Sequence, residues 1–67
     1  MIINREAVFI AMSRKQWQRA DLAKEMGISV QAINIMLSGK VRHCYARTAG
    51  RLAEALGVDV AEILVKE

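Results

Sequence analysis

Two amide side chains stand in a stretch of the chain that carries almost no charge. Gln31 and Asn34 are three residues apart, with Ile35 and Ser38 after them, so a helix places all four on one face. An amide both donates and accepts hydrogen bonds and can bind adenine through two of them, while an aliphatic side chain can contact the methyl group of thymine. This face therefore predicts contact with base edges. The alternative is an ordinary solvated helix face, which normally carries Lys and Glu.

Two short helices must position this face. The first is expected over residues 19–26, where Leu22, Ala23 and Met26 share one side, and the second over residues 30–38. The second helix has its own apolar stripe, formed by Val30, Ile33, Met36 and Leu37. Gly27 suits a left-handed residue just after the first helix, and Ser29 suits the N-cap of the second. The two helices are thus joined as in a helix-turn-helix.

These residues resemble the helix-turn-helix of the Cro and phage-repressor family, also called the XRE family. The resembling residues are Leu22, Ala23, Gly27, Ile28, Ser29, Ala32, Ile33, Asn34, Ser38, Gly39 and Lys40. Downstream, residues 52–58 and 62–64 resemble the closing helices of the same family. The resemblance covers residues 5–65 and implies an all-α, compact five-helix lambda-repressor-like domain, with the helix-turn-helix at helices 2 and 3. It also implies a bacterial or phage transcription regulator, most simply a repressor, that binds double-stranded DNA.

Three further helices are expected around this pair. The first covers residues 5–15, with Asn4 as its N-cap and with Phe9 and Ile10 widening its buried stripe. The fourth covers residues 48–56, with Thr48 as its N-cap and with Gly50 at a point of close packing. The fifth covers residues 60–65 after an N-cap at Asp59. Gln18 stands where the family commonly has serine or threonine, which predicts a weaker cap for helix 2.

The DNA-binding residues expected from the sequence and the resemblance lie in three groups. The resemblance places Arg19 against a phosphate, at the start of helix 2. The second group lies on helix 3: Ser29, Val30, Gln31, Ala32, Asn34 and Ile35. Gln31 is expected at a base edge and Asn34 at a base or a phosphate. Val30 and Ala32 pack beside Gln31, and Ile35 contacts a base methyl or another protein. The third group is the basic loop, where Lys40, Arg42 and Arg47 either follow the phosphate backbone or are simply solvated, and where the resemblance allows Arg47 to approach the minor groove.

Charge is distributed unevenly along the 67 residues, which suffice for one helix-turn-helix domain over residues 1–67. The net charge is +3, but no acidic residue lies between Met26 and Ala53, whereas four lie between Glu54 and Glu67. A basic middle beside an acidic end suits a polyanion that approaches from one side. The longest apolar run is far shorter than a membrane span, and no signal peptide is recognisable.

The adjacent pair His43 and Cys44 is the one place where metal binding or nucleophilic catalysis could be considered. The chain contains no other His or Cys, and two ligands do not make a structural zinc site. A nucleophile and base also need a third group that orients them. We therefore expect no metal, no cofactor and no enzymatic activity, and the lone cysteine, which cannot form an internal disulfide, fits a cytoplasmic protein.

One helix reads few base pairs, so useful specificity implies a homodimer on a palindromic operator. The apolar segments at the two ends are candidates for the dimer contact: residues 1–3, which could instead extend over the core, and Val60, Ile63, Leu64 and Val65. The alternative is a protein-interaction module or an antitoxin that keeps the helix-turn-helix fold, served by the acidic end and by exposed Ile35 and Leu37. Leu37 could equally join the core.

Overall fold

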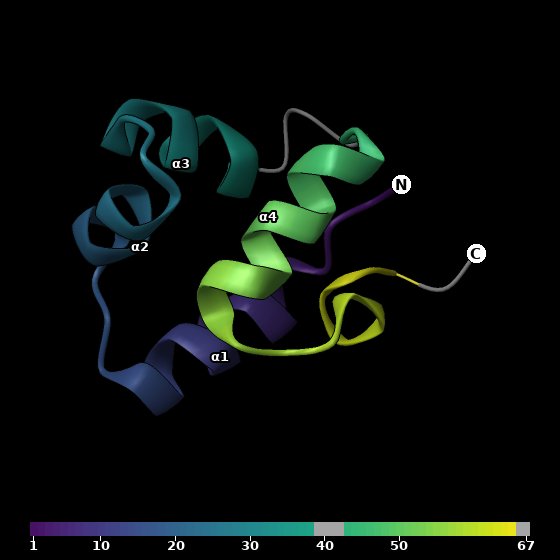
Figure 1. The fold of residues 1–67 in the computed structure, drawn as a ribbon, viewed down its shortest axis with the longest axis horizontal. Coiled ribbons are helices and arrows are strands. Elements are labelled where there is room, and N and C mark those ends of the chain that lie inside the picture. The colour runs from purple at the N-terminus through teal and green to yellow at the C-terminus, as the bar shows by residue number, and fades with distance from the viewer. Residues whose placement is uncertain (39–42, 66–67) are drawn as a thin grey trace.

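The computed structural model describes residues 1–38 and 43–65. The described residues form four α-helices and one short 3-10 helix: α1 Arg5–Lys15, α2 Arg19–Met26, α3 Val30–Leu37, α4 Ala46–Leu56 and η1 Val60–Ile63 (Figure 1). α2 packs against α3 at one end of the molecule, and α4 runs through the middle, where it contacts α1, α2 and η1. The all-α fold is therefore confirmed, whereas the fifth α-helix is not.

The ends of the helices follow local signals in the sequence. The Asn4 side chain accepts a hydrogen bond from the amide of Ala7 at 3.2 Å, and the Ser29 hydroxyl accepts one from the amide of Ala32 at 3.1 Å. Gly27 ends α2 in the left-handed region, with φ of 70°. These capping bonds supply partners for backbone groups that a helix end leaves unpaired, so the predicted starts of α1 and α3 are confirmed.

The start of α4 was expected at Thr48, and that prediction is wrong. The helix begins at Ala46 after an extended N-cap residue, Tyr45, whose carbonyl accepts a hydrogen bond from the amide of Ala49 at 3.0 Å. Ala46 and Arg47 both favour helix, so the helix extends backward past the hydroxyl residue that could have capped it.

The chain leaves the last helix early because its end pairs with the N-terminus. Ile3 and Leu64 form an antiparallel bridge. The amide of Asn4 donates to the carbonyl of Ile63, and the amide of Val65 donates to the carbonyl of Ile2, both at 2.8 Å. The extended backbone of Leu64 (ψ of 143°) therefore ends η1 at Ile63, which corrects the expected helix over residues 60–65. The N-terminal segment accordingly extends over the core of its own chain.

One core lies between α1, α2, α3, α4 and η1. Its fully buried large side chains are Val8, Leu22, Ile33, Leu52 and Ile63. Leu37 also joins the core, at 2% exposure, which decides between the two roles considered for it. Phe9 and Ile10 do not widen the buried stripe of α1, because α1 packs on α4 and η1 through one face and leaves these two side chains 36% and 48% exposed.

Gly50 provides a test of the packing of α4. A methyl group at this exposed position would meet no atom within 4 Å outside its own helix, which corrects the expected close packing. Gly50→Ala should therefore raise the free energy of unfolding by about 0.5–1 kcal/mol, because alanine loses less backbone entropy in a helix. Urea denaturation measures the change. Gly57→Ala is the matched control and should be destabilising, since Gly57 has φ of 69°. Loss of stability in Gly50→Ala would restore the close-packing interpretation.

Candidate nucleic-acid interface

α3 turns its amide-bearing face away from the core. Ile33 and Leu37 are 0% and 2% exposed and hold the opposite face inward. Gln31, Asn34 and Ile35 are all exposed, as the helical spacing predicts. The predicted reading face is thus one continuous surface of α3.

Aliphatic side chains lie beside the amides. Ile35 is 52% exposed and Val30 is 41% exposed, while Ala32 is half-buried. Val30 was expected in the buried stripe, but the first turn of α3 extends beyond the core residues, so Val30 joins the exposed face instead. No charged residue occurs in Val30–Leu37. The face therefore combines hydrogen-bonding amides with methyl groups, which suits base edges in a major groove.

A side-chain contact joins the start of α2 to the middle of α3. The Arg19 guanidinium donates a hydrogen bond to Oδ1 of Asn34 at 2.8 Å, and its central carbon lies 5.5 Å from the centre of the Phe9 ring. Arginine has five N–H donors, and this bond uses one nitrogen. The remaining N–H groups can bind a phosphate while Asn34 holds the side chain in place. Because Oδ1 of Asn34 is the acceptor, its amide nitrogen is the group that can donate to DNA.

The start of α2 already contains an anion. The Asp21 carboxylate accepts a hydrogen bond from the backbone amide of Gln18 at 2.7 Å. This bond satisfies one N–H of the helix end and places negative charge in the first turn. Attraction of a phosphate to this end must therefore come chiefly from the guanidinium of Arg19.

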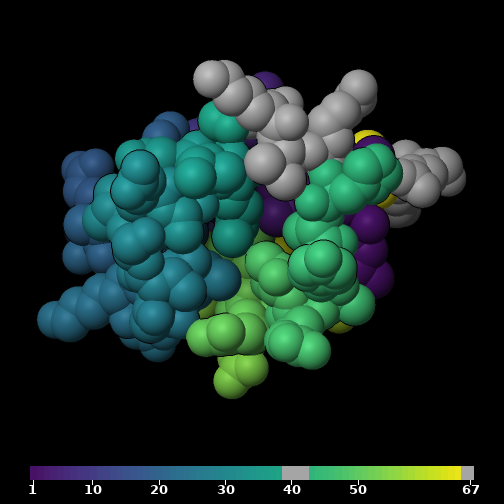
Figure 2. All heavy atoms as spheres, turned by 90° about the horizontal axis from the view of Figure 1, so that it is seen from above, coloured from purple at the N-terminus to yellow at the C-terminus, as the bar shows by residue number. Residues whose placement is uncertain are grey.

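The start of α4 lies on the same face of the molecule as α3 (Figure 2). Arg47 is exposed in the first turn of α4, where the helix dipole disfavours a cation. Tyr45, just before it, is 84% exposed, and the two residues border a small hollow with Thr48. A phenol and a guanidinium side by side can both donate to phosphate. Sequence reasoning did not include Tyr45, although a tyrosine inside a basic loop was the available signal.

The basic residues Lys40, Arg42 and Arg51 cannot be assigned one common role. Lys40 and Arg42 lie outside the described residues, so their predicted backbone contacts stay predictions. Arg51 has a structural contact instead: its guanidinium donates to the carbonyl of Met26 at 2.8 Å. This bond satisfies a carbonyl at the end of α2 and fixes α2 against α4.

A second arginine binds the C-terminal end of α3. Arg5, at the start of α1, donates to the carbonyl of Leu37 at 3.3 Å. Arg5 and Arg51 thus each bind the C-terminal end of one helix of the helix-turn-helix. The local sequence does not predict these two hydrogen bonds, because each acceptor is a backbone carbonyl more than twenty residues away.

Other kinds of site would need metal ligands, a reactive cysteine or a membrane-spanning helix among residues 1–38 and 43–65. In this part of the chain no three His, Cys, Asp or Glu side chains gather closely enough to hold a metal ion. Cys44 is a half-buried free thiol, and its amide donates to the carbonyl of Met1 at 2.8 Å. None of the described helices has both the length and the apolar character needed to cross a bilayer.

Comparison with known proteins agrees with this geometry. A family model described as the Cro/C1-type HTH DNA-binding domain matches residues 10–67, which include α2, α3 and every residue of the reading face. Searches of curated proteins and of solved structures found no match. The family match supports DNA binding, with a role in the regulation of transcription. The chain belongs to the Cro/C1-type HTH DNA-binding domain family.

Proposed function

We propose that this chain is a sequence-specific binder of double-stranded DNA that represses transcription, with α3 inserted in the major groove. The observation that carries the proposal is the outer face of α3. It exposes two amides and two aliphatic side chains, carries no charge, and is held outward by the burial of Ile33 and Leu37. A solvated helix gains nothing from such a face, whereas base edges match it.

Each group of residues has a separate task in this proposal. Gln31 reads a base edge, most simply adenine, and Val30 and Ile35 contact thymine methyl groups. Arg19, held by Asn34, contacts a phosphate and fixes the register of the helix on the duplex. Arg47 and Tyr45 contact the backbone from the start of α4. Lys40 and Arg42, by their sequence position, extend this contact.

The size of the chain argues for two copies on DNA. The longest dimension of the Cα trace is 29 Å. Successive major grooves on one face of B-DNA are about 34 Å apart, so one chain reads one groove. A homodimer on a palindromic operator would read two. A cytoplasmic location, with bacterial or phage origin, is the setting in which such a regulator meets its operator.

The alternative is a protein-interaction module or an antitoxin that keeps the fold. The exposed apolar side chains Phe9, Ile10 and Val65, which border one groove beside α1, favour this alternative. The two functions respond differently to salt. A phosphate-binding protein loses affinity as counterion release weakens, whereas an apolar contact between proteins does not.

Replacing Gln31 by alanine tests direct base reading. Gln31→Ala should cost roughly 1–3 kcal/mol on the preferred site and should relax the preference at one base pair. The affinity for a panel of single-base variants of that site measures both effects. Glu25→Gln, a change at an exposed residue near the C-terminal end of α2, is the control and should leave the base preference intact. An unchanged preference in Gln31→Ala would remove Gln31 from the readout.

Replacing Arg19 by alanine tests the phosphate contact. Arg19→Ala should weaken binding to all sequences about equally, and should reduce the slope of log affinity against log salt by about 0.9, the value for one phosphate. Asn34→Ala is the matched comparison: it removes the bond that holds Arg19 but keeps the charge, so the slope should stay. A sequence-selective loss in Arg19→Ala would contradict the backbone role. If the affinity of the wild-type chain for DNA does not change with salt concentration, the protein-interaction module is favoured.

A further inference from the structure

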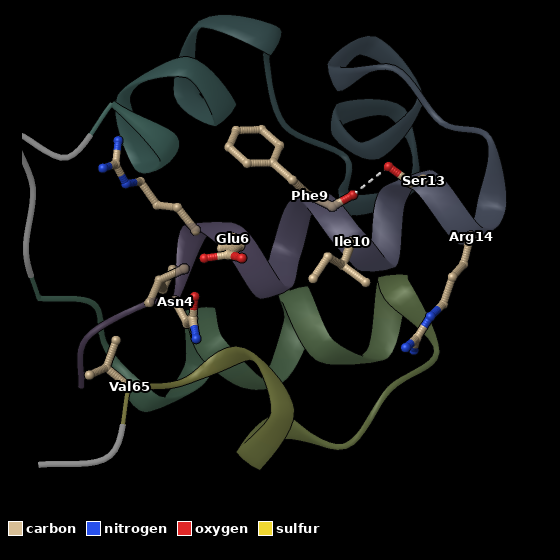
Figure 3. Close-up of a pocket in the computed structure, with 9 residues that line it drawn as sticks. Asn4, Glu6, Phe9, Ile10, Ser13, Arg14 and Val65 are labelled. Atoms are coloured by element: carbon tan, nitrogen blue, oxygen red, sulfur yellow. Dashed lines mark hydrogen bonds between the residues drawn. The ribbon is translucent and has the colours of Figure 1, made fainter.

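The outer face of α1 borders an open groove that the described residues leave uncovered. Phe9 and Ile10 project from α1 into this region, and Val65 lies at its edge, 43% exposed (Figure 3). The inner face of α1 packs on α4 and η1. Phe9 and Ile10 therefore lie outside the buried core of their own chain.

Charged residues flank the apolar centre of this face symmetrically. Glu6 and Arg14 both border the groove and are exposed, four residues before and four residues after Ile10. On a helix each lies about 6 Å from Ile10 along the axis, on the same side (Figure 3). Arg5 also borders the groove, but its guanidinium donates to the carbonyl of Leu37. The face thus reads acid, apolar, base along α1.

We propose that this groove is the contact between two copies of the chain, formed by antiparallel packing of α1 on α1 with Ile10 at the two-fold axis. In an antiparallel pair centred on Ile10, Glu6 faces Arg14 of the partner subunit, and Arg14 faces Glu6 of the partner subunit. Both charge pairs are attractive and Ile10 meets the same residue of the partner, which is the self-complementarity that a two-fold contact requires.

The other apolar segments are partly used within the chain, although Val60 and Val65 stay 38% and 43% exposed. Ile3 and Leu64 form their bridge with each other, and Ile63 is fully buried. They therefore have less surface to offer a partner than the sequence alone indicates. The charges on the face of α1 also complement a second copy of the same face.

The symmetry of this contact suits a dimer on DNA. The two-fold axis of an antiparallel helix pair is perpendicular to the plane that holds both helices. In Figure 3, α2 and α3 lie on one side of α1, and α4 and η1 lie on the other. The partner's α1 would lie in front of α1 in this view, so the two-fold axis runs from the side of α4 and η1 to the side of α2 and α3. Rotation about this axis leaves both helix-turn-helix elements on the same side of the dimer. This last step rests on the proposed function, whereas the contact itself does not.

Charge reversal tests the contact. Glu6→Arg and Arg14→Glu, each in the full chain, would place like charges opposite each other, and the dimer dissociation constant should rise by about tenfold or more. An equimolar mixture of the two variants should recover dimers, because the heterodimer again pairs opposite charges at both places. The double variant should recover them too. Sedimentation measures the oligomeric state, and Glu25→Arg on α2 is the control that should dimerise normally.

Three results would overturn the proposal: a wild-type chain that is monomeric up to its solubility limit, single variants that dimerise as well as wild type, or a mixture that fails to recover dimers although both variants are folded. Because these variants alter helix-end charges, a disulfide cross-link gives a second measurement. Ile10→Cys with Cys44→Ser should form a disulfide dimer readily, and Ala20→Cys with Cys44→Ser should not. Equal cross-linking at both positions would also overturn the contact.

The outcome is separate from the test of DNA binding. If the charge-reversal variants change dimerisation as predicted but the chain selects no DNA sequence, the contact is supported and the proposed function is wrong. If the chain selects a half-site yet stays monomeric, the proposed DNA binding is supported and the contact is wrong.

Discussion

The burial of Ile33 and Leu37 determines which way α3 faces, and the rest of the surface follows from it. Both side chains are inside a core to which α2 contributes Leu22, Ala23 and Met26. Turning α3 by one residue, about 100° around its axis, so that Asn34 replaced Ile33 in the core would bury an amide without a partner, which costs about 1–3 kcal/mol. The reading face is therefore fixed by the same packing that stabilises the fold.

Arginines connect this packing to the surface in two different ways. Arg5 and Arg51 donate to backbone carbonyls at the ends of α3 and α2, and so hold the helix pair from both sides. Arg19 lies on the surface and binds Asn34, so the side chain expected at a phosphate is ordered before DNA arrives. A side chain that is already positioned loses less entropy on binding.

Local signals allowed much of the fold to be predicted from the sequence. The caps at Asn4 and Ser29 and the left-handed Gly27 are short-range features, and α1 and α3 begin and α2 ends where these signals indicate. The failures concern contacts between distant residues: η1 ends early because Leu64 pairs with Ile3, and Phe9 is exposed because only one face of α1 meets the core. For the candidate site, the exposed face of α3 followed from helical spacing, but the bond from Arg19 to Asn34 depends on how α2 crosses α3. The DNA-contact roles of these residues remain predictions.

Selection from a random pool of DNA duplexes shows whether α3 reads a DNA sequence. The purified full chain would be incubated with the pool at near-physiological salt, and the bound duplexes sequenced over successive rounds. We expect enrichment of an inverted repeat whose half-sites are about 34 Å apart, one turn of the double helix. No enrichment from a chain shown to be folded would contradict it.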